Sequence, residues 1–370
     1  MNEMIPGIRP TIRDVHPYVA GKTTEQVRRE LGLSSVVKLG SNENPYAPFP
    51  TALEAMQAAL ATIHTYPENS FVELRRRIGS LYDLSGDHVA IAHGAGGMLE
   101  TIARAFVQPG DEVVTLSPTY GLYREISRFM GAEIVTVPVA EDHATRMEDL
   151  VAAVTPATKI VWLCNPNNPT GTVTRPADLT PLLDALPPHG WVVVDEAYAE
   201  FADAEVLPDS VSAVRSGRHV IVVRTFSKAY GLAGARMGYA LADPATITAI
   251  DTVAEPFNAN RVGIAGATAT LDGGLAEVRA AVEKIRNGRA RLEAALAELG
   301  MEVVSTHTNF VFFALPDGHQ ADAVADALLH RGVIVRSAAG WGYPRHMRVT
   351  VGTEEENETF LRAFREVLDG

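Results

Sequence analysis

Residues 220–238 read VIVVRTFSKAYGLAGARMG. The β-branched run 220–223 ends in polar and glycine-rich sequence, which is the pattern of a buried strand bounded by a turn. Open α/β sheets place their ligands at the carboxyl ends of such strands. The stretch therefore predicts that Ser227 and Lys228 lie at a ligand-binding edge. A lysine that is buried there, or placed beside another cation, loses its proton more readily than usual.

Strand patterns recur along the first two thirds of the chain and alternate with helical patterns. Strands are predicted at 88–92, 112–116, 132–137, 159–164 and 191–194, and helices at 50–60, 71–82, 98–107, 119–130, 147–154 and 176–186. Such alternation is typical of an α/β protein with a mostly parallel sheet and helices on both faces. The strands that end at Ala92, Cys164, Val194 and Val223 run into polar or glycine-rich sequence, so we expect one site along that edge.

The pattern changes near residue 267. A long helix is predicted at 275–299, followed by strands at 302–304, 310–315, 333–336 and 347–351 and helices at 321–330 and 354–368. A chain of 370 residues exceeds one typical hydrophobic core. We therefore expect a large domain, 46–266, and a smaller α+β lobe that is built from both termini, 1–45 and 267–370.

The composition argues against several classes of partner. A hydrophobic content of 46% and a charged content of 21% are typical of a soluble globular protein. The formal net charge of -13 disfavours DNA, RNA and anionic membranes as main partners. No HExxH motif or paired-cysteine spacing indicates a metal site. The single cysteine, Cys164, excludes an internal disulfide, and no apolar leader or membrane-length run is visible. These features predict a cytoplasmic protein that acts on small molecules.

A second ligand-binding feature is the run 93–97, HGAGG, between the predicted strand 88–92 and the predicted helix 98–107. Free N–H groups and the helix dipole favour an anion at such a junction, so Ala95 and Gly96 are candidate phosphate-binding residues. The last glycine of a dinucleotide fingerprint would fall on Leu99, which disfavours a nicotinamide-dependent oxidoreductase. A simple tight turn is the alternative interpretation of this run.

Further motifs occur in a fixed order along the chain. They are HPYVAGK at 16–22, NENPY at 42–46, YPE at 66–68, NPNNPTG at 165–171, DEAY at 195–198, RTFSKAYGLAGAR at 224–236, EPFNANR at 255–261, IVRS at 334–337 and MRVTVGT at 347–353. Together they resemble the histidinol-phosphate aminotransferase family, whose members depend on pyridoxal 5'-phosphate (PLP) and have the fold of type I PLP-dependent transferases. The resemblance covers nearly the whole chain. The chain departs from the family pattern at Ala47, where glycine is frequent, and at 96–98, where the family has a polar run.

The resemblance implies an enzyme that transfers the amino group of L-histidinol phosphate to 2-oxoglutarate, giving imidazole-acetol phosphate and L-glutamate in histidine biosynthesis. It also implies a homodimer with shared sites, in which Tyr66 of one subunit reaches the PLP phosphate of the other. A half-buried aromatic beside a turn is the alternative for Tyr66. Close relatives leave two other activities open, an aromatic (phenylalanine) aminotransferase and a threonine-phosphate decarboxylase. A PLP-binding transcriptional regulator is disfavoured by the acidic charge and by the lack of a helix-turn-helix segment before the domain.

PLP presents groups that the large domain must bind. Its phosphate matches backbone N–H groups, hydroxyls and a guanidinium, which can come from Ala95, Gly96, Thr225, Ser227 and Arg236. Its protonated pyridine nitrogen matches a carboxylate, and Asp195 leaves a buried strand where an unpaired carboxylate would be costly. Glu196, the next residue, is expected to point the other way. An exposed strand end is the alternative for Asp195.

The remaining PLP contacts follow from neighbouring motifs. Tyr198 and Asn168 are candidates to hydrogen-bond the phenolate oxygen of PLP. Tyr120 is a candidate to stack on its ring, with core packing as the alternative. Lys228 is the expected covalent attachment point and the carrier of a proton between substrate and cofactor.

Two arginines are candidates for substrate binding. Arg336 follows the β-branched run 333–335, and Arg348 opens the run 348–351. One guanidinium matches a carboxylate and two can hold a phosphate, so the pair suits both glutamate and histidinol phosphate. Solubility of an edge strand is the alternative. The resemblance adds Tyr18 and Asn42 as substrate-binding residues.

Overall fold

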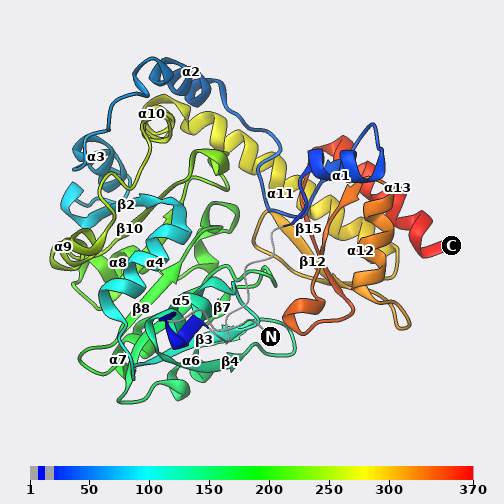
Figure 1. Cartoon of the computed structure of the whole chain (residues 1–370). Coiled ribbons are helices and arrows are strands. Elements are labelled where there is room, and N and C mark those ends of the chain that lie inside the picture. Colours follow the sequence, from blue (N-terminus) through cyan, green and yellow to red (C-terminus); the bar gives the residue numbers. More distant parts are fainter. Residues whose placement is uncertain (1–6, 13–20, 370) are drawn as a thin grey trace.

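The computed structural model describes residues 7–12 and 21–369, and a seven-stranded sheet lies at its centre (Figure 1). In spatial order the strands are β2 (Val89–His93), β10 (Met237–Leu241), β9 (Val220–Thr225), β8 (Trp191–Asp195), β6 (Thr158–Cys164), β3 (Glu112–Ser117) and β4 (Glu133–Pro138). All neighbours are parallel except β10, which is antiparallel to both β2 and β9. The predicted mostly parallel sheet is confirmed.

Helices cover both faces of this sheet, as predicted. One face packs on α4 (Gly94–Phe106), α5 (Leu122–Met130) and α9 (Pro244–Val253), through a core that includes Val193 of β8. The other face carries Val192 and Val194 and packs on α3 (Val72–Ser80), α6 (Met147–Ala153), α7 (Thr180–Ala185) and α8 (Ser210–Arg215). Alternate residues of β8 therefore enter different cores, which is why its sequence is apolar throughout.

Strand β10 is the strand of the central sheet that the sequence did not predict. Its five residues are all buried, so they lack the alternation that marks a half-exposed strand. Gly238 of β10 pairs with Ala92 of β2 and with Thr225 of β9. A Cβ atom at Gly238 would lie 2.4 Å from the backbone nitrogen of Ala95. Glycine at this position therefore lets β10 contact the first turn of α4, where the candidate phosphate-binding residues lie.

Helix α4 begins earlier than predicted. It starts at Gly94 rather than at residue 98, so Ala95 and Gly96 belong to its first turn. Glycines are weak helix formers, and the sequence therefore favoured a turn there. Other boundaries were also wrong, and α7 begins at Thr180 rather than at residue 176. Helix α5 begins at Leu122 rather than at residue 119, and the predicted strand 333–336 is divided between two sheets.

The C-terminal part contains a four-stranded antiparallel sheet in the order β11 (Glu302–Val304), β12 (Phe310–Ala314), β15 (His346–Thr350) and β14 (Arg336–Ser337). Helices α12 (Ala321–His330) and α13 (Glu354–Asp369) lie with it, and α11 (Leu275–Glu298) runs between the two sheets (Figure 1). Helix α10 (Arg261–Ala269) packs against α2 (Pro50–Ala59).

The described part of the N-terminal segment packs on the C-terminal part. Strand β1 (Val37–Lys38) pairs in parallel with β13 (Val333–Ile334). Helix α1 (Thr24–Leu31) buries Val27 in a small cluster with Val36 and Ile334. None of the described helices is long and apolar enough to span a membrane.

Candidate active site

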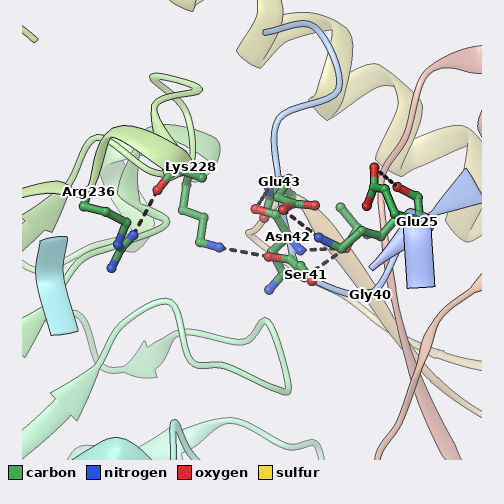
Figure 2. A network of polar contacts seen from close by, with 12 residues as sticks. Glu25, Gly40, Ser41, Asn42, Glu43, Lys228 and Arg236 are labelled. Carbon is green, nitrogen blue, oxygen red and sulfur yellow. Dashed lines mark hydrogen bonds and ion pairs between the residues drawn. The ribbon is translucent and has the colours of Figure 1, made fainter. Parts of the chain in front are cut away.

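The candidate site lies at the carboxyl ends of the parallel strands, where the loop 40–44 reaches over them. Lys228 follows β9, and its Nζ atom donates to the carbonyl oxygen of Ser41 over 3.1 Å (Figure 2). Tyr198 follows β8, and its hydroxyl accepts a 2.9 Å hydrogen bond from Nδ2 of Asn42. Residues far apart in sequence are thereby fixed beside each other, as the predicted edge requires.

Arg348 connects the C-terminal sheet to this edge. Its side chain in β15 is only 6% exposed. Its Nη1 atom donates to Oδ1 of Asn168 over 2.5 Å, and its Nη2 atom donates to the carbonyl oxygen of Gly40 over 2.9 Å. Arg336 stands directly opposite Arg348 in the β14–β15 pair. Both predicted arginines therefore belong to the same region as Asn168 and Lys228.

Asp195 is a buried carboxylate, with 4% of its surface exposed. Its Oδ2 atom accepts a 2.7 Å hydrogen bond from the hydroxyl of Tyr123, and its Oδ1 atom accepts one of 3.1 Å from the backbone nitrogen of Ala197. Burial raises the pKa of Asp195 to about 6, although these two hydrogen bonds lower it. A cationic partner would remove that cost of burial.

Tyr123 is the site residue that the sequence analysis missed. It is fully buried in α5, where its ring stacks on Trp162 with centroids 5.6 Å apart and meets Tyr120 edge-on at the same distance. An aromatic residue in an amphipathic helix is normally read as core packing. The only signal in the sequence is the spacing of three residues from Tyr120, which would put both rings on one face of the predicted helix 119–130, although α5 begins after Tyr120.

Lys228 has the altered acidity that the sequence predicted. Burial, followed by the positive charge of Arg348, lowers the pKa of its amine to about 8. The Nζ atom lies 5.9 Å from the centre of the Tyr198 ring. A lysine with such a pKa has a substantial neutral fraction near pH 8, and the neutral amine is the form that attacks a carbonyl.

The first turn of α4 meets Arg236. Gly94 has φ of +75°, and a Cβ atom there would lie 2.6 Å from Nη2 of Arg236. The guanidinium is oriented by a 3.0 Å hydrogen bond from Nη1 to the carbonyl oxygen of Ala233 and lies 3.5 Å from Oγ of Ser227 (Figure 2). Free N–H groups at a helix start, a guanidinium and a hydroxyl are together suited to a phosphate.

Thr225 has a structural role beside this cradle. Its hydroxyl donates to the carbonyl oxygen of Met237 over 3.4 Å and accepts a 3.0 Å hydrogen bond from the backbone nitrogen of Ser227. These bonds tie the end of β9 to β10 and to the residue before Lys228. The hydroxyl thereby fixes the direction in which Ser227 and Lys228 leave the strand.

Glu196 points away from Asp195, as expected. Its Oε2 atom accepts hydrogen bonds of 2.5 Å and 2.9 Å from Nη2 and Nε of Arg224. Glu200 lies 3.5 Å from the same guanidinium. This buried ion pair links the residue after β8 to a residue of β9, so it holds together the two strand ends that carry Asp195 and Lys228.

One predicted residue lies outside the cluster. Tyr66 is 76% exposed and stacks on Phe257, with ring centroids 4.4 Å apart. Tyr18 falls outside the residues that the structure describes. Within 7–12 and 21–369 there is no group of three or more histidine, cysteine, aspartate or glutamate residues placed to hold a metal ion.

The hydrogen bond from Tyr123 to Asp195 gives a testable prediction. Tyr123→Phe removes a donor to a charged acceptor, a contact worth about 1.5–3 kcal/mol. The pKa of Asp195 should then rise above about 6, so more of the carboxyl is protonated at pH 7. We expect PLP to dissociate at least about tenfold more readily, measured by equilibrium dialysis.

Tyr82→Phe is the matched control for this measurement. It removes another buried tyrosine hydroxyl, which makes a 2.7 Å contact with the hydroxyl of Tyr239 away from Asp195. PLP retention should stay close to that of the wild type. Equal losses in the two variants would show that Tyr123 acts through general stability and not through Asp195.

Comparisons with known proteins show the family of this chain. The sequence pattern described as aminotransferase class I and II matches residues 34–364. A histidinol-phosphate aminotransferase of Symbiobacterium thermophilum is 41% identical over 361 residues, which cover 98% of both chains. One of Moorella thermoacetica is 40% identical over 98% of this chain and 94% of its own.

Solved structures agree with the sequence comparisons. The histidinol-phosphate aminotransferase of Sinorhizobium meliloti in complex with PLP superimposes with a TM-score of 0.88 at 32% identity, over 99% of both chains. A double mutant of the aspartate aminotransferase of Thermus thermophilus superimposes with a TM-score of 0.84 at 26% identity, over 98% of this chain and all of the other. The chain belongs to the class I and II aminotransferase family.

Proposed function

We propose that this protein is a PLP-dependent transaminase that converts L-histidinol phosphate and 2-oxoglutarate to imidazole-acetol phosphate and L-glutamate. The observation that carries the proposal is the pairing of Arg336 with Arg348 beside Lys228, because two guanidiniums suit a phosphate as well as a carboxylate. Relatives named histidinol-phosphate aminotransferase, with 36–41% identity, support the same substrate. The predicted role in histidine biosynthesis follows from this activity.

The described residues fit PLP. The pKa of Asp195 is raised by burial, so its carboxylate gains from a cation such as a protonated pyridine nitrogen. The phosphate suits the start of α4, with the N–H groups of Ala95 and Gly96, together with Ser227 and Arg236. When bound, PLP supplies an electron sink for negative charge on the substrate carbon.

The remaining site residues would orient the cofactor and move a proton. Tyr198, which accepts from Asn42, and Asn168, which accepts from Arg348, would hydrogen-bond the phenolate oxygen. Tyr120, whose ring meets that of Tyr123 edge-on, would cover one ring face. In its neutral form, the Nζ atom of Lys228 can take a proton from the substrate carbon and return it to the cofactor.

We also propose a homodimer in which Tyr66 serves the partner's site. Tyr66 is far too exposed for a tyrosine that acts within its own chain. Other large apolar side chains on or near α2 and α3 are also exposed, and such a patch is typical of an interface. The exposed side chains of this patch are Leu53, Leu60, Ile63, Tyr66, Val72 and Phe257.

The predicted domain division and location are also proposals. The β1–β13 pairing supports a lobe built from 1–45 and 267–370, although its border falls inside α10. The single free thiol, which is the buried Cys164, is compatible with a cytoplasmic location. Limited proteolysis would test the division, and fractionation of the source cells would test the location.

Half-reactions with separate amines test the proposed substrate. The wild type should convert L-histidinol phosphate with higher kcat/KM than L-phenylalanine, measured from the absorbance of bound PLP. Arg336→Gln removes one charge-assisted contact and should lower kcat/KM for histidinol phosphate about ten- to a hundredfold, with a smaller loss for phenylalanine. Arg348→Gln should also impair the reaction with glutamate. A wild type that favours phenylalanine would instead support an aromatic aminotransferase.

Mixing inactive variants tests the shared sites. In a heterodimer of Lys228→Ala and Tyr66→Phe subunits, one site lacks both groups and the other keeps both. Activity should therefore reappear after the two purified variants are unfolded and refolded together, relative to each variant treated alone. If the mixture stays as inactive as the separate variants, Tyr66 does not act across the interface.

A further inference from the structure

The ring of Trp341 lies close to both of the arginines proposed to bind substrate, Arg336 and Arg348. It ends the short 3-10 helix Ala339–Trp341, in the connection between β14 and β15. The guanidinium carbon of Arg348 lies over its ring, 5.3 Å from the centroid, and that of Arg336 lies at 5.8 Å. Both distances fall within the range of about 6 Å in which a cation is attracted to the face of an aromatic ring. One indole therefore contacts both guanidiniums.

An aromatic ring beside both arginines reduces the repulsion between their two positive charges. Arg336 and Arg348 are directly opposite each other in an antiparallel pair, an arrangement in which like charges repel. An electron-rich ring beside both cations offsets part of that repulsion. The indole can thus keep two guanidiniums close together before any anion arrives, which is the arrangement that a phosphate dianion requires.

Arg348 has further anchors that do not depend on Trp341. Oδ1 of Asn168 and the carbonyl oxygen of Gly40 accept from it, and its guanidinium lies 5.2 Å from the centre of the Phe310 ring. Removal of the indole would leave these contacts in place. Arg348 would then keep its position and its charge and would continue to repel Arg336. Arg336 would lose the aromatic face that lies 5.8 Å from its guanidinium carbon, so less of the repulsion between the two guanidiniums would be offset.

We propose that Trp341 is a specificity-determining residue for phosphate-bearing amines. Its ring positions the guanidinium of Arg336 beside that of Arg348, so that both can bind one phosphate dianion. An amine without a phosphate does not need the second guanidinium. This inference rests on the proposed function, and it names a residue that selects the phosphorylated substrate without itself donating a hydrogen bond to the phosphate.

The experiment compares L-histidinol phosphate with L-histidinol, which differs only by the phosphate. For each holoenzyme variant, the ratio of the two kcat/KM values is measured from single half-reactions. Trp341→Leu should lower this ratio roughly three- to thirtyfold, which is the range that loss of one cation–π contact gives. Trp341→Phe, which keeps an aromatic face, should stay within about threefold of the wild type. If Trp341→Leu does not fold, Trp341→Met takes its place as the variant without a ring.

Tyr343→Leu is the matched control in the same connection. The Tyr343 ring packs against His143 and His346, with centroids 5.2 Å and 4.8 Å away, so it tests general damage to the loop. Its selectivity ratio should equal that of the wild type. The proposal is overturned if Trp341→Leu leaves the ratio unchanged, or if Tyr343→Leu lowers it equally.

A second readout separates this inference from the proposed function. A wild type whose kcat/KM for L-histidinol phosphate does not exceed that for unphosphorylated amines contradicts the proposed function. In that case inorganic phosphate is tested as a competitive inhibitor against whichever amine the enzyme accepts. Weaker inhibition in Trp341→Leu, by roughly three- to thirtyfold, still supports a phosphate site organised by Trp341. An unchanged inhibition constant overturns the inference.

Discussion

The burial of two ionisable side chains at adjacent strand ends is the constraint on which the site depends. Asp195 ends β8 and Lys228 follows β9, and the strands are held in register by pairs such as Asp195 with Val223. Burial disfavours the charged form of each group, so it raises the pKa of Asp195 to about 6 and lowers that of Lys228 to about 8. Their neighbours partly offset this cost: Tyr123 donates to Asp195, and Ser41 accepts from Lys228.

The same constraint explains why parts of the chain far apart in sequence meet here. The loop 40–44 and β15 supply hydrogen-bond partners for the polar residues at the strand ends. Asn42 connects the end of β8 to β15. Its Nδ2 atom donates to Tyr198, and its Oδ1 atom accepts a 3.1 Å hydrogen bond from Thr350. Arg348 acts twice, because it holds Asn168 and its charge lowers the pKa of Lys228. The substrate-binding role proposed for Arg348 and the acidity of the Lys228 amine are therefore linked.

The sequence predicted the strand ends well, because a buried strand followed by polar residues is a local pattern. Lys228, Asp195 and Asn168 were found in this way. Contacts set by tertiary packing were not predictable. Strand β10 is fully buried and lacks alternation, and Tyr123 has the local pattern of a core aromatic that reveals no bond to Asp195. The split of 333–337 between two sheets depends on the pairing of Val333 with Val37, a partner that is distant in sequence.

The pH dependence of PLP attachment reports whether the amine of Lys228 is buried and has a lowered pKa. The rate at which PLP reacts with the cofactor-free protein should rise with pH through a midpoint near 8, because the neutral amine of Lys228 reacts. Arg348→Gln removes a nearby positive charge, so the pKa of Lys228 and the midpoint should both increase. Arg336→Gln should change the midpoint less than Arg348→Gln, because Arg348 is the positive charge with the largest effect on that pKa. A wild-type midpoint near 10.5, the ordinary value for lysine, would contradict the account.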